Sequence, residues 1–147
     1  MHPQVSRTFH GRDIFAPAAA HLAKGHSPSD FGVEINDYIL PSFEEPQLRK
    51  GRLLGEVLYI DDFGSIVTNI SVRELKTLGA DEGCLLSVKF KGEALDLKLC
   101  SAYGQVSAGK ALAVIGSSDF LEIAVNQASA TQILQARAGD SVEISLR

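Results

Sequence analysis

The sequence predicts a mainly β protein with short helices, in which a C-terminal β-barrel-like domain is preceded by a helical stub and a linker. The first observation is the alanine-rich, helix-like segment FHGRDIFAPAAAHLA at residues 9–23. The second is a proline-containing stretch without hydrophobic period, and the third is a run of short Val-, Ile- and Leu-rich segments from Arg52 onward. We therefore divide the chain into a helical stub (1–25), a linker (26–51) and a barrel domain (52–147).

The helical stub is predicted over residues 13–24. Asp13 suits a cap or the first turn, alanines form the body, and Gly25 follows as a stop signal. Pro17 is tolerated only near a helix start, which favours a beginning nearer Ala16.

The linker holds three prolines and scattered charges within HSPSDFGVEINDYILPSFEEPQLRK. We expect an extended segment that lies partly on a protein surface through its apolar side chains, namely Phe31, Ile35, Tyr38, Ile39 and Phe43.

Seven strands are predicted in the last two thirds of the chain, at residues 53–60, 65–70, 84–90, 94–103, 110–116, 120–126 and 141–147. A helix over residues 71–80 begins at Ser71, and Glu74 stands at capping-box spacing. A second helix is predicted over residues 128–139, ended by Gly139. This order of elements indicates a compact, mostly antiparallel barrel or sandwich.

Composition and charge exclude several classes of function. The net charge is −4 and no basic stripe is present, which argues against a nucleic-acid partner. No apolar run reaches membrane-spanning length and no secretory signal pattern is present, so we expect a cytoplasmic protein without membrane contact.

Cys84 and Cys100 lack metal-type spacing and are expected to be buried free thiols, although they could face each other across a sheet. The four histidines show no zinc spacing, so we expect no metal.

His10, beside Arg12 and Asp13, is the first candidate functional residue. Its imidazole could orient or deprotonate water because the pKa of histidine lies near neutrality. The alternative is a solvated histidine at a helix cap.

The second candidate cluster is IDDFG at residues 60–64. Asp61 and Asp62 could bind a cation or an amine, and Phe63 could offer the face of its ring. The alternative is an ordinary hairpin, because Asp and Gly are common turn residues.

The third cluster follows in residues 101–130. Tyr103 stands in a predicted loop, and the hydroxyls of Ser117 and Ser118 suit a carboxylate or the edge of a base. The alternatives are a serine-rich turn at residues 116–119 and a helix cap at Asn126.

Together these clusters, in the order TFHGRDIFAPAAAHLA, YIDDFGSIVTNI and AYGQVSAGKALAVIGSSDFLEIAVNQASA, resemble the S-adenosylmethionine (SAM) hydroxide adenosyltransferase family. The family hydrolyses SAM to adenosine and methionine and is related to the fluorinases and chlorinases. The resemblance implies a two-domain protein, with an N-terminal α/β domain, a linker and a C-terminal β-barrel. It also implies a trimer with each site between neighbouring subunits. Residues 1–25 then correspond to the end of the N-terminal domain.

The resemblance also implies roles for individual residues. His10 matches the histidine of an Asp-Arg-His triad that activates water, with the other two members expected upstream. Asp61 matches the carboxylate that holds the methionine ammonium, and Ser117 with Ser118 matches the segment that meets the methionine carboxylate. The remaining expected substrate contacts are with the adenosyl group, from Phe63, Ser65, Tyr103, Asn126, Gln127 and Ala128.

Two positions depart from the family pattern, and two others indicate which branch of the family the chain resembles. Asp62 stands where the family usually has arginine, and Ser65 replaces an asparagine that reaches adenine. Val67 and Ser118 replace a tryptophan and an arginine, which resembles the hydrolases rather than the halogenases.

The resulting expectation is the C-terminal portion of a SAM hydrolase that uses SAM as substrate without a cofactor. This chain alone is expected to be inactive, and the full-length form to be the enzyme. The alternative is a non-catalytic module that binds adenosine or SAM, or one that only mediates oligomerisation.

Overall fold

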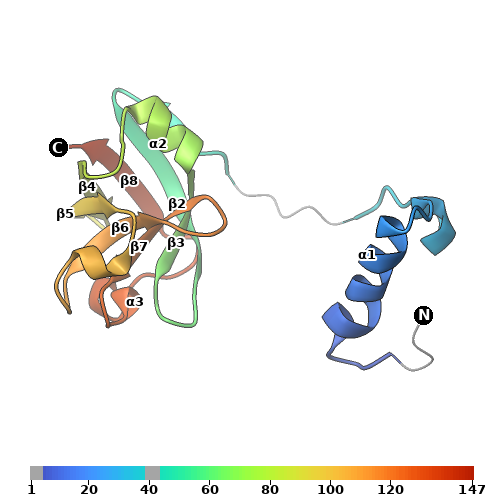
Figure 1. Cartoon of the computed structure of the whole chain (residues 1–147). Helices are drawn as coiled ribbons and strands as arrows, with labels where there is room; N and C mark the ends of the chain where they lie inside the picture. The colour runs from blue at the N-terminus through green and yellow to red at the C-terminus, as the bar shows by residue number, and fades with distance from the viewer. Residues whose placement is uncertain (1–4, 39–43) are drawn as a thin grey trace. The chain divides into compact units, whose positions relative to one another are not determined.

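A computed structural model describes residues 5–38 and 44–147 of the chain. The chain divides into two compact units, Met1–Pro41 and Ser42–Arg147, coloured from blue to red along the chain in Figure 1. Within the described ranges, no helix is long and apolar enough to cross a membrane.

The first unit is built around one short helix. A π-helical turn, η1 (Gly11–Phe15), leads into α1 (Ala16–Ala23), and a 3-10 turn, η2 (Pro28–Phe31), follows. The α-helix begins at Ala16 because Pro17 is accommodated in its first turn, and Gly25 ends the segment with a φ of +90°.

Of the apolar side chains expected to lie on a protein surface, Phe31 has an edge contact with the ring of His21, with 6.3 Å between the ring centroids. Ile35 and Tyr38 are 63% and 61% exposed, while Ile39 and Phe43 lie outside the described residues. The end of the predicted linker forms a strand, β1 (Gln47–Arg49), which makes a hairpin with the next strand, β2 (Arg52–Ile60), through a turn at Lys50 and Gly51.

The second unit is a closed barrel of seven strands with β1 added to it. The closed ring runs β2-β3-β7-β6-β5-β4-β8 and returns to β2 through a β2–β8 pairing. All neighbours are antiparallel except β5 and β6. The strands are β1 (Gln47–Arg49), β2 (Arg52–Ile60), β3 (Ile66–Ser71), β4 (Leu85–Phe90), β5 (Glu93–Cys100), β6 (Ala111–Ile115), β7 (Phe120–Val125) and β8 (Ser141–Leu146). The prediction of a mainly β, barrel-like fold is therefore confirmed.

Strand β2 closes the barrel by pairing with β8 and β3 along different parts of its length. Residues 52–56 pair with β8, and residues from Val57 onward pair with β3, with a register shift between Val57 and Tyr59. Gly55 lies where the two pairings meet, and a Cβ there would overlap Asn69 Oδ1 and come within 2.7 Å of Ile70 Cγ1. The absent side chain therefore lets β3 cross close to β2.

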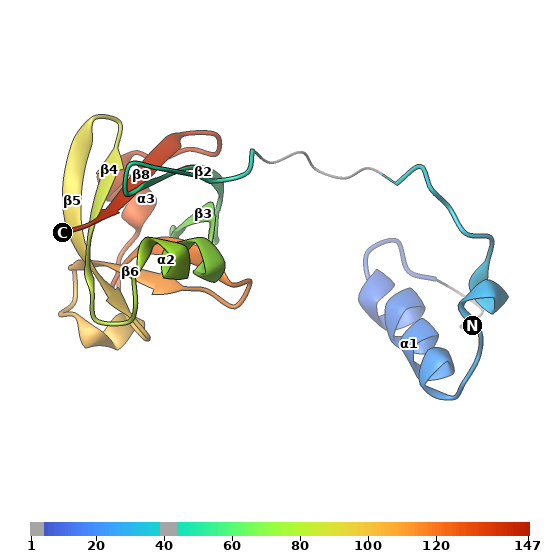
Figure 2. The same cartoon turned by 90° about the horizontal axis from the view of Figure 1, so that it is seen from above.

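The interior of the barrel is filled by alternate residues of its strands, as the apolar alternation predicts. Ile66, Leu86, Ile123 and Ile144 are fully buried there. Helix α2 (Val72–Leu78) adds Leu75, and α3 (Ala130–Leu134) adds its first residue. Figures 1 and 2 show the two helices at opposite ends of the barrel.

The ends of the two helices follow local hydrogen bonds. The predicted capping box of α2 is present, with Ser71 N donating to Glu74 Oε2 at 2.8 Å. Helix α3 is shorter than the predicted span of 128–139, because Gln135 adopts a left-handed conformation with φ of +50°. A separate turn follows, in which Arg137 N donates to Asp140 Oδ2 at 2.8 Å.

Both cysteines carry free thiols, as expected. Cys100 is buried, whereas Cys84, immediately before β4, is only half-buried, contrary to the expectation that both are buried.

Candidate functional site

A cleft of about 930 Å³ in the barrel unit gathers residues from four separate segments. These are the β2–β3 turn, the loop that begins at Ser101, the end of β6 with β7, and the connection from β7 to α3. The predicted substrate-binding residues that line it are Asp61, Phe63, Ser65, Tyr103, Ser117, Gln127 and Ala128. Residues up to 67 positions apart in the sequence, from Asp61 to Ala128, therefore share one cavity.

The β2–β3 turn holds the Asp61 carboxylate in a fixed orientation. Asp61 Oδ1 accepts hydrogen bonds from Phe63 N at 2.9 Å and Ser65 N at 2.7 Å. Gly64 has φ of +84°, and a Cβ there would overlap Ser129 Oγ, so the turn packs against the start of α3. The cluster is thus a hairpin turn, and that same turn presents Asp61 and the 84% exposed Phe63 ring to the cleft.

Tyr103 forms another wall of the cleft, at the start of the 3-10 turn η3 (Tyr103–Gln105). Its hydroxyl donates to Glu122 Oε2 at 2.9 Å. Burial raises the pKa of Tyr103, and the hydrogen bond to Glu122 and the negative charges of Glu122 and Asp61 add to the rise. The Ser65 hydroxyl acts on the pKa in the opposite direction. The phenol therefore interacts with two other walls of the cleft.

The β6–β7 turn separates the two predicted serines. Gly116 N donates to Phe120 O and Asp119 N donates to Gly116 O, at 2.9 and 3.1 Å. Ser117 lines the cleft, but Ser118 lines a neighbouring hollow of about 370 Å³ near the start of α2. Successive residues of this turn thus face different cavities, so the structure does not bring both serines to one site.

The connection from β7 to α3 brings Gln127 and Ala128 to the cleft, whereas Asn126 does not line it. Asn126 Nδ2 donates to Val106 O at 2.7 Å and so ties the strand end to the preceding loop. The interpretation of Asn126 as a helix cap is wrong, because Ser129 Oγ accepts from Gln132 N at 3.3 Å and caps α3.

His10 lies in the first unit, immediately before η1, and is exposed. Its side chain makes no capping hydrogen bond. Arg12 Nε donates to the buried carboxylate of Asp13 at 2.6 Å, and this hydrogen bond with the charge of Asp13 raises the pKa of Arg12. Asp13 also accepts from Ser6 N at 2.8 Å. Arg12 and Asp13 therefore stabilise the local turn, and His10 remains exposed.

Sequence reasoning missed Glu122, which lines the cleft from the middle of β7. The signal that could have found it is a single carboxylate in the otherwise apolar strand FLEIAV. Ser101 and Ser129 also line the cleft and were not predicted.

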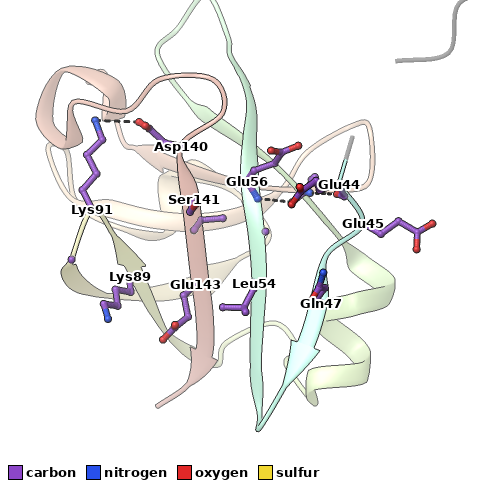
Figure 3. A pocket seen from close by; sticks show the side chains of 14 residues that line it. Glu44, Glu45, Gln47, Leu54, Glu56, Lys89, Lys91, Asp140, Ser141 and Glu143 are labelled. Carbon is purple, nitrogen blue, oxygen red and sulfur yellow. Dashed lines mark hydrogen bonds and ion pairs between the residues drawn. The ribbon is translucent and has the colours of Figure 1, made fainter. Parts of the chain in front are cut away.

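A second pocket, of about 490 Å³, lies over strands β1, β2, β8 and β4 (Figure 3). At one end of it, Lys91 Nζ forms an ion pair with Asp140 Oδ2 at 3.1 Å and also donates to Gln135 O at 2.6 Å. A backbone hydrogen bond from Arg137 lowers the pKa of Asp140, and Lys91 lowers it further. Asn69 spans the other end, donating to Glu44 O at 2.6 Å and accepting from Glu56 N at 2.8 Å. The polar groups of this pocket thus stabilise strand ends, and no predicted site residue lines it.

Metal ligation has no candidate in the part of the chain that the structure describes. No group of three or more His, Cys, Asp or Glu side chains there could hold an ion.

Comparison with known proteins gives two family matches. The family profile of the SAM hydroxide adenosyltransferase C-terminal domain matches residues 55–143, and that of the N-terminal domain matches residues 1–32.

Individual relatives agree with these matches. A (R)-S-adenosyl-L-methionine hydrolase of Thermus thermophilus is 36% identical over 142 residues, which cover 93% of this chain and 49% of that protein. A fluorinase of Nocardia brasiliensis is 32% identical over 149 residues, covering 97% of this chain and 50% of the fluorinase. A crystal structure of an uncharacterized conserved protein from Thermotoga maritima superposes with a TM-score of 0.72 at 36% identity, over 97% of this chain and 54% of that one. The chain thus spans about half the length of the curated relatives it matches.

Proposed function

We propose that this chain, which belongs to the SAM hydroxide adenosyltransferase family, supplies the methionine- and adenosine-binding part of a SAM hydrolase. The observation that carries the proposal is the single cleft into which seven predicted substrate-binding residues converge from distant segments. The reaction is the displacement of methionine from C5′ of SAM by water. A C5′–O bond forms, the C5′–S bond breaks with its electron pair passing to sulfur, and the water loses one proton and keeps the other as the 5′-hydroxyl of adenosine.

Asp61 is proposed to bind the ammonium group of the methionine part. Two backbone N–H groups hold its Oδ1 atom, which fixes the direction in which Oδ2 points. A carboxylate held in this way forms a charge-assisted hydrogen bond without first losing rotamer freedom. Ser117, on the β6–β7 turn of the same cleft, is proposed to donate to the methionine carboxylate.

The adenosyl group is proposed to lie between the rings of Phe63 and Tyr103, with the backbone of Gln127 and Ala128 at the adenine edge. The exposed Phe63 ring offers apolar area that a nucleoside would cover. Ser118 and the side chain of Asn126 are left out of this proposal, because one lines another hollow and the other is bonded to Val106.

His10 is proposed to take part in holding the attacking water in the full-length enzyme. Fixing a nucleophile in line with its target is worth about 7–11 kcal/mol of barrier, so an incomplete water site loses many orders of magnitude in rate. We propose that the remaining water-holding groups come from the half of the relatives that this chain does not match. By itself the chain is then a binding module without turnover.

Assembly and location are further parts of the proposal. We propose a homotrimer in the cytoplasm, with SAM as the only small molecule required. Exposed apolar side chains support association, including Phe15 at 67% and Val33 at 90% exposure.

The test of binding uses calorimetry with SAM on the wild-type chain, Asp61→Asn and Asp62→Asn. Asp61→Asn keeps the acceptor of the turn but removes the charge, so SAM should bind about 10- to 100-fold more weakly. Asp62→Asn is the matched control, since Asp62 is exposed and does not line the cleft. Equal losses in the two variants, or no binding to the wild-type chain, would overturn the proposal.

The test of turnover follows adenosine by chromatography after incubation of the chain with SAM. We expect no enzymatic turnover from the wild-type chain. Turnover that His10→Ala abolishes would show that the water site is complete within these 147 residues.

A further inference from the structure

We propose that Glu122 is a positioning residue of the cleft, which holds the Tyr103 phenol in place as a wall, and that Gly116 provides the space its carboxylate needs. The inference rests on the proposed function for its ligand, adenosine, but its structural part is independent of any ligand.

The first support is the contact itself. Tyr103 OH donates to Glu122 Oε2 at 2.9 Å, and the two residues are 19 positions apart in the sequence. Tyr103 belongs to a three-residue 3-10 turn, which offers the ring little support of its own. Glu122 lies in the middle of β7, which pairs with both β3 and β6. The hydrogen bond therefore ties a short turn to a strand that is paired on both sides.

The second support is the shape around the carboxylate. A Cβ on Gly116 would overlap Glu122 Oε1, and Glu122 Cδ would be 2.6 Å away. Gly116 has no positive φ, so backbone conformation does not require glycine there. The absent side chain instead leaves room for Glu122 to reach toward Tyr103.

The third support is the position of the phenol between walls of the cleft. Tyr103 interacts with Glu122 on β7 and also with Ser65 and the charge of Asp61 on the β2–β3 turn. Asp61 and Glu122 are the two carboxylates among the lining residues, and no Lys or Arg accompanies them. Releasing Tyr103 would open the wall on which a nucleoside is proposed to pack.

The experiment on the free protein labels the ring Cζ carbon of the three tyrosines and follows their titration by NMR. Tyr103→Phe identifies the Tyr103 signal by removing it. Glu122→Gln keeps the shape of the side chain but removes the charge, so Tyr103 should titrate at lower pH. Glu122→Ala and Gly116→Ala should shift it in the same direction, while Glu93→Gln on the exposed start of β5 should not. An unshifted Tyr103 signal in Glu122→Gln would overturn the proposal.

The second measurement is adenosine binding at neutral pH by calorimetry. Glu122→Ala and Tyr103→Phe should each weaken binding about three- to tenfold, as expected for one lost hydrogen bond. The double variant should lose no more than the worse single variant, because both changes remove the same contact. Glu122→Gln should retain most of the affinity, since its amide oxygen still accepts from the phenol.

The outcomes separate the two proposals. If the wild-type chain does not bind adenosine, the proposed function fails while the titration still decides the role of Glu122. If the wild-type chain binds adenosine and the two single losses add in full, Glu122 does not act through Tyr103 and the positioning role is wrong.

Discussion

The two units of this chain obtain their structure in different ways. In the barrel unit, most buried apolar side chains from Leu53 to Ile144 form a main core that includes residues of both helices. Cys100, Leu112 and Ala124 form a smaller, separate cluster. In the described part of the first unit, Asp13 is the only buried residue, and α1 buries none of its side chains. The barrel is therefore stabilised by packing between distant segments, and the first unit by local hydrogen bonds.

The difference shows how much stability interactions between residues close in the sequence can provide. The first unit has an ion pair between Arg12 and Asp13, a capping box at Ser27 and Asp30, and an alanine-rich helix. A helix of eight residues is nonetheless marginal in water without tertiary packing. Helix α1 thus requires a covering surface for full stability, whereas the barrel contains its own core.

The two units should differ most in how much stability is lost when a large apolar side chain is truncated to alanine. Ile123→Ala removes a fully buried side chain from β7 and should lower the free energy of unfolding by about 2–5 kcal/mol. Leu22→Ala, at a position 44% exposed in α1, should change it by less than about 0.5 kcal/mol. Urea denaturation measures both. Equal effects would mean that α1 belongs to the cooperative core.

Two glycines with similar backbone angles give the next contrast. Gly64→Ala introduces strain at φ of +84° and an overlap with Ser129, and should destabilise the chain by about 1–3 kcal/mol. Gly25 has φ of +90° with open space around it, so Gly25→Ala should leave the unfolding midpoint of the barrel unchanged. Thermal unfolding followed by near-ultraviolet circular dichroism compares the two. A stable Gly64→Ala variant would mean that the turn does not pack on α3.

The two capping boxes give a smaller contrast. Ser71→Ala should cost about 1 kcal/mol of unfolding free energy, while Ser27→Ala should cost none in the barrel transition. Burial raises the pKa of Glu74, but hydrogen bonds from Ser71 and from the Glu74 backbone, together with the charge of Arg73, lower it below its usual value of 4.5.

The lowered pKa of Glu74 makes the free energy of unfolding depend on pH. A lowered pKa in the folded state adds stability that is complete above pH 4.5 and is lost as pH falls through the folded value. Ser71→Ala should therefore make unfolding less dependent on pH in that acid range, as measured by denaturation at several pH values. An unchanged pH dependence would mean that the Ser71 hydroxyl does not lower the pKa of Glu74.

The smallest effect is expected from removal of the first unit. A chain that begins at residue 44 keeps every buried apolar residue and the cleft, so its unfolding free energy should stay within about 0.5 kcal/mol of the intact chain. Urea denaturation of both chains checks this. A loss of several kcal/mol would contradict the independence of the barrel.

The sequence was sufficient to predict the seven barrel strands and the start of α2. Alternating apolar residues and a capping box are local patterns, and they match the observed β2 to β8 and Ser71. The strand predicted over residues 94–103 is too long, because β5 ends at Cys100 and Tyr103 belongs to η3. The strand β1 was missed because its three residues, Gln47, Leu48 and Arg49, are all exposed and show no alternation. The barrel closure at β2–β8 joins segments about 90 residues apart, which no local pattern reveals.

The sequence predicted those site residues whose type alone suggests binding. It did not predict which neighbouring side chains face the cleft, because that depends on the folded backbone. Asp61, Phe63 and Tyr103 stand out as polar or aromatic residues in loops, and they line the cleft. Ser118 looks equivalent to Ser117 in sequence, yet the turn directs it to another hollow. Glu122 was overlooked because its importance depends on a contact with Tyr103 and on the absence of a side chain at Gly116.

The most direct test of the central claim maps adenosine on the nitrogen-15-labelled chain by NMR. We predict that the shifted amide signals belong to the cleft, around residues 61–65, Ser117 and residues 127–129. The pocket of Figure 3, around Glu56 and Lys91, should remain unshifted, as should α1. Shifts concentrated at that pocket, or no shifts at millimolar adenosine, would contradict the claim that the barrel cleft is the ligand site of this chain.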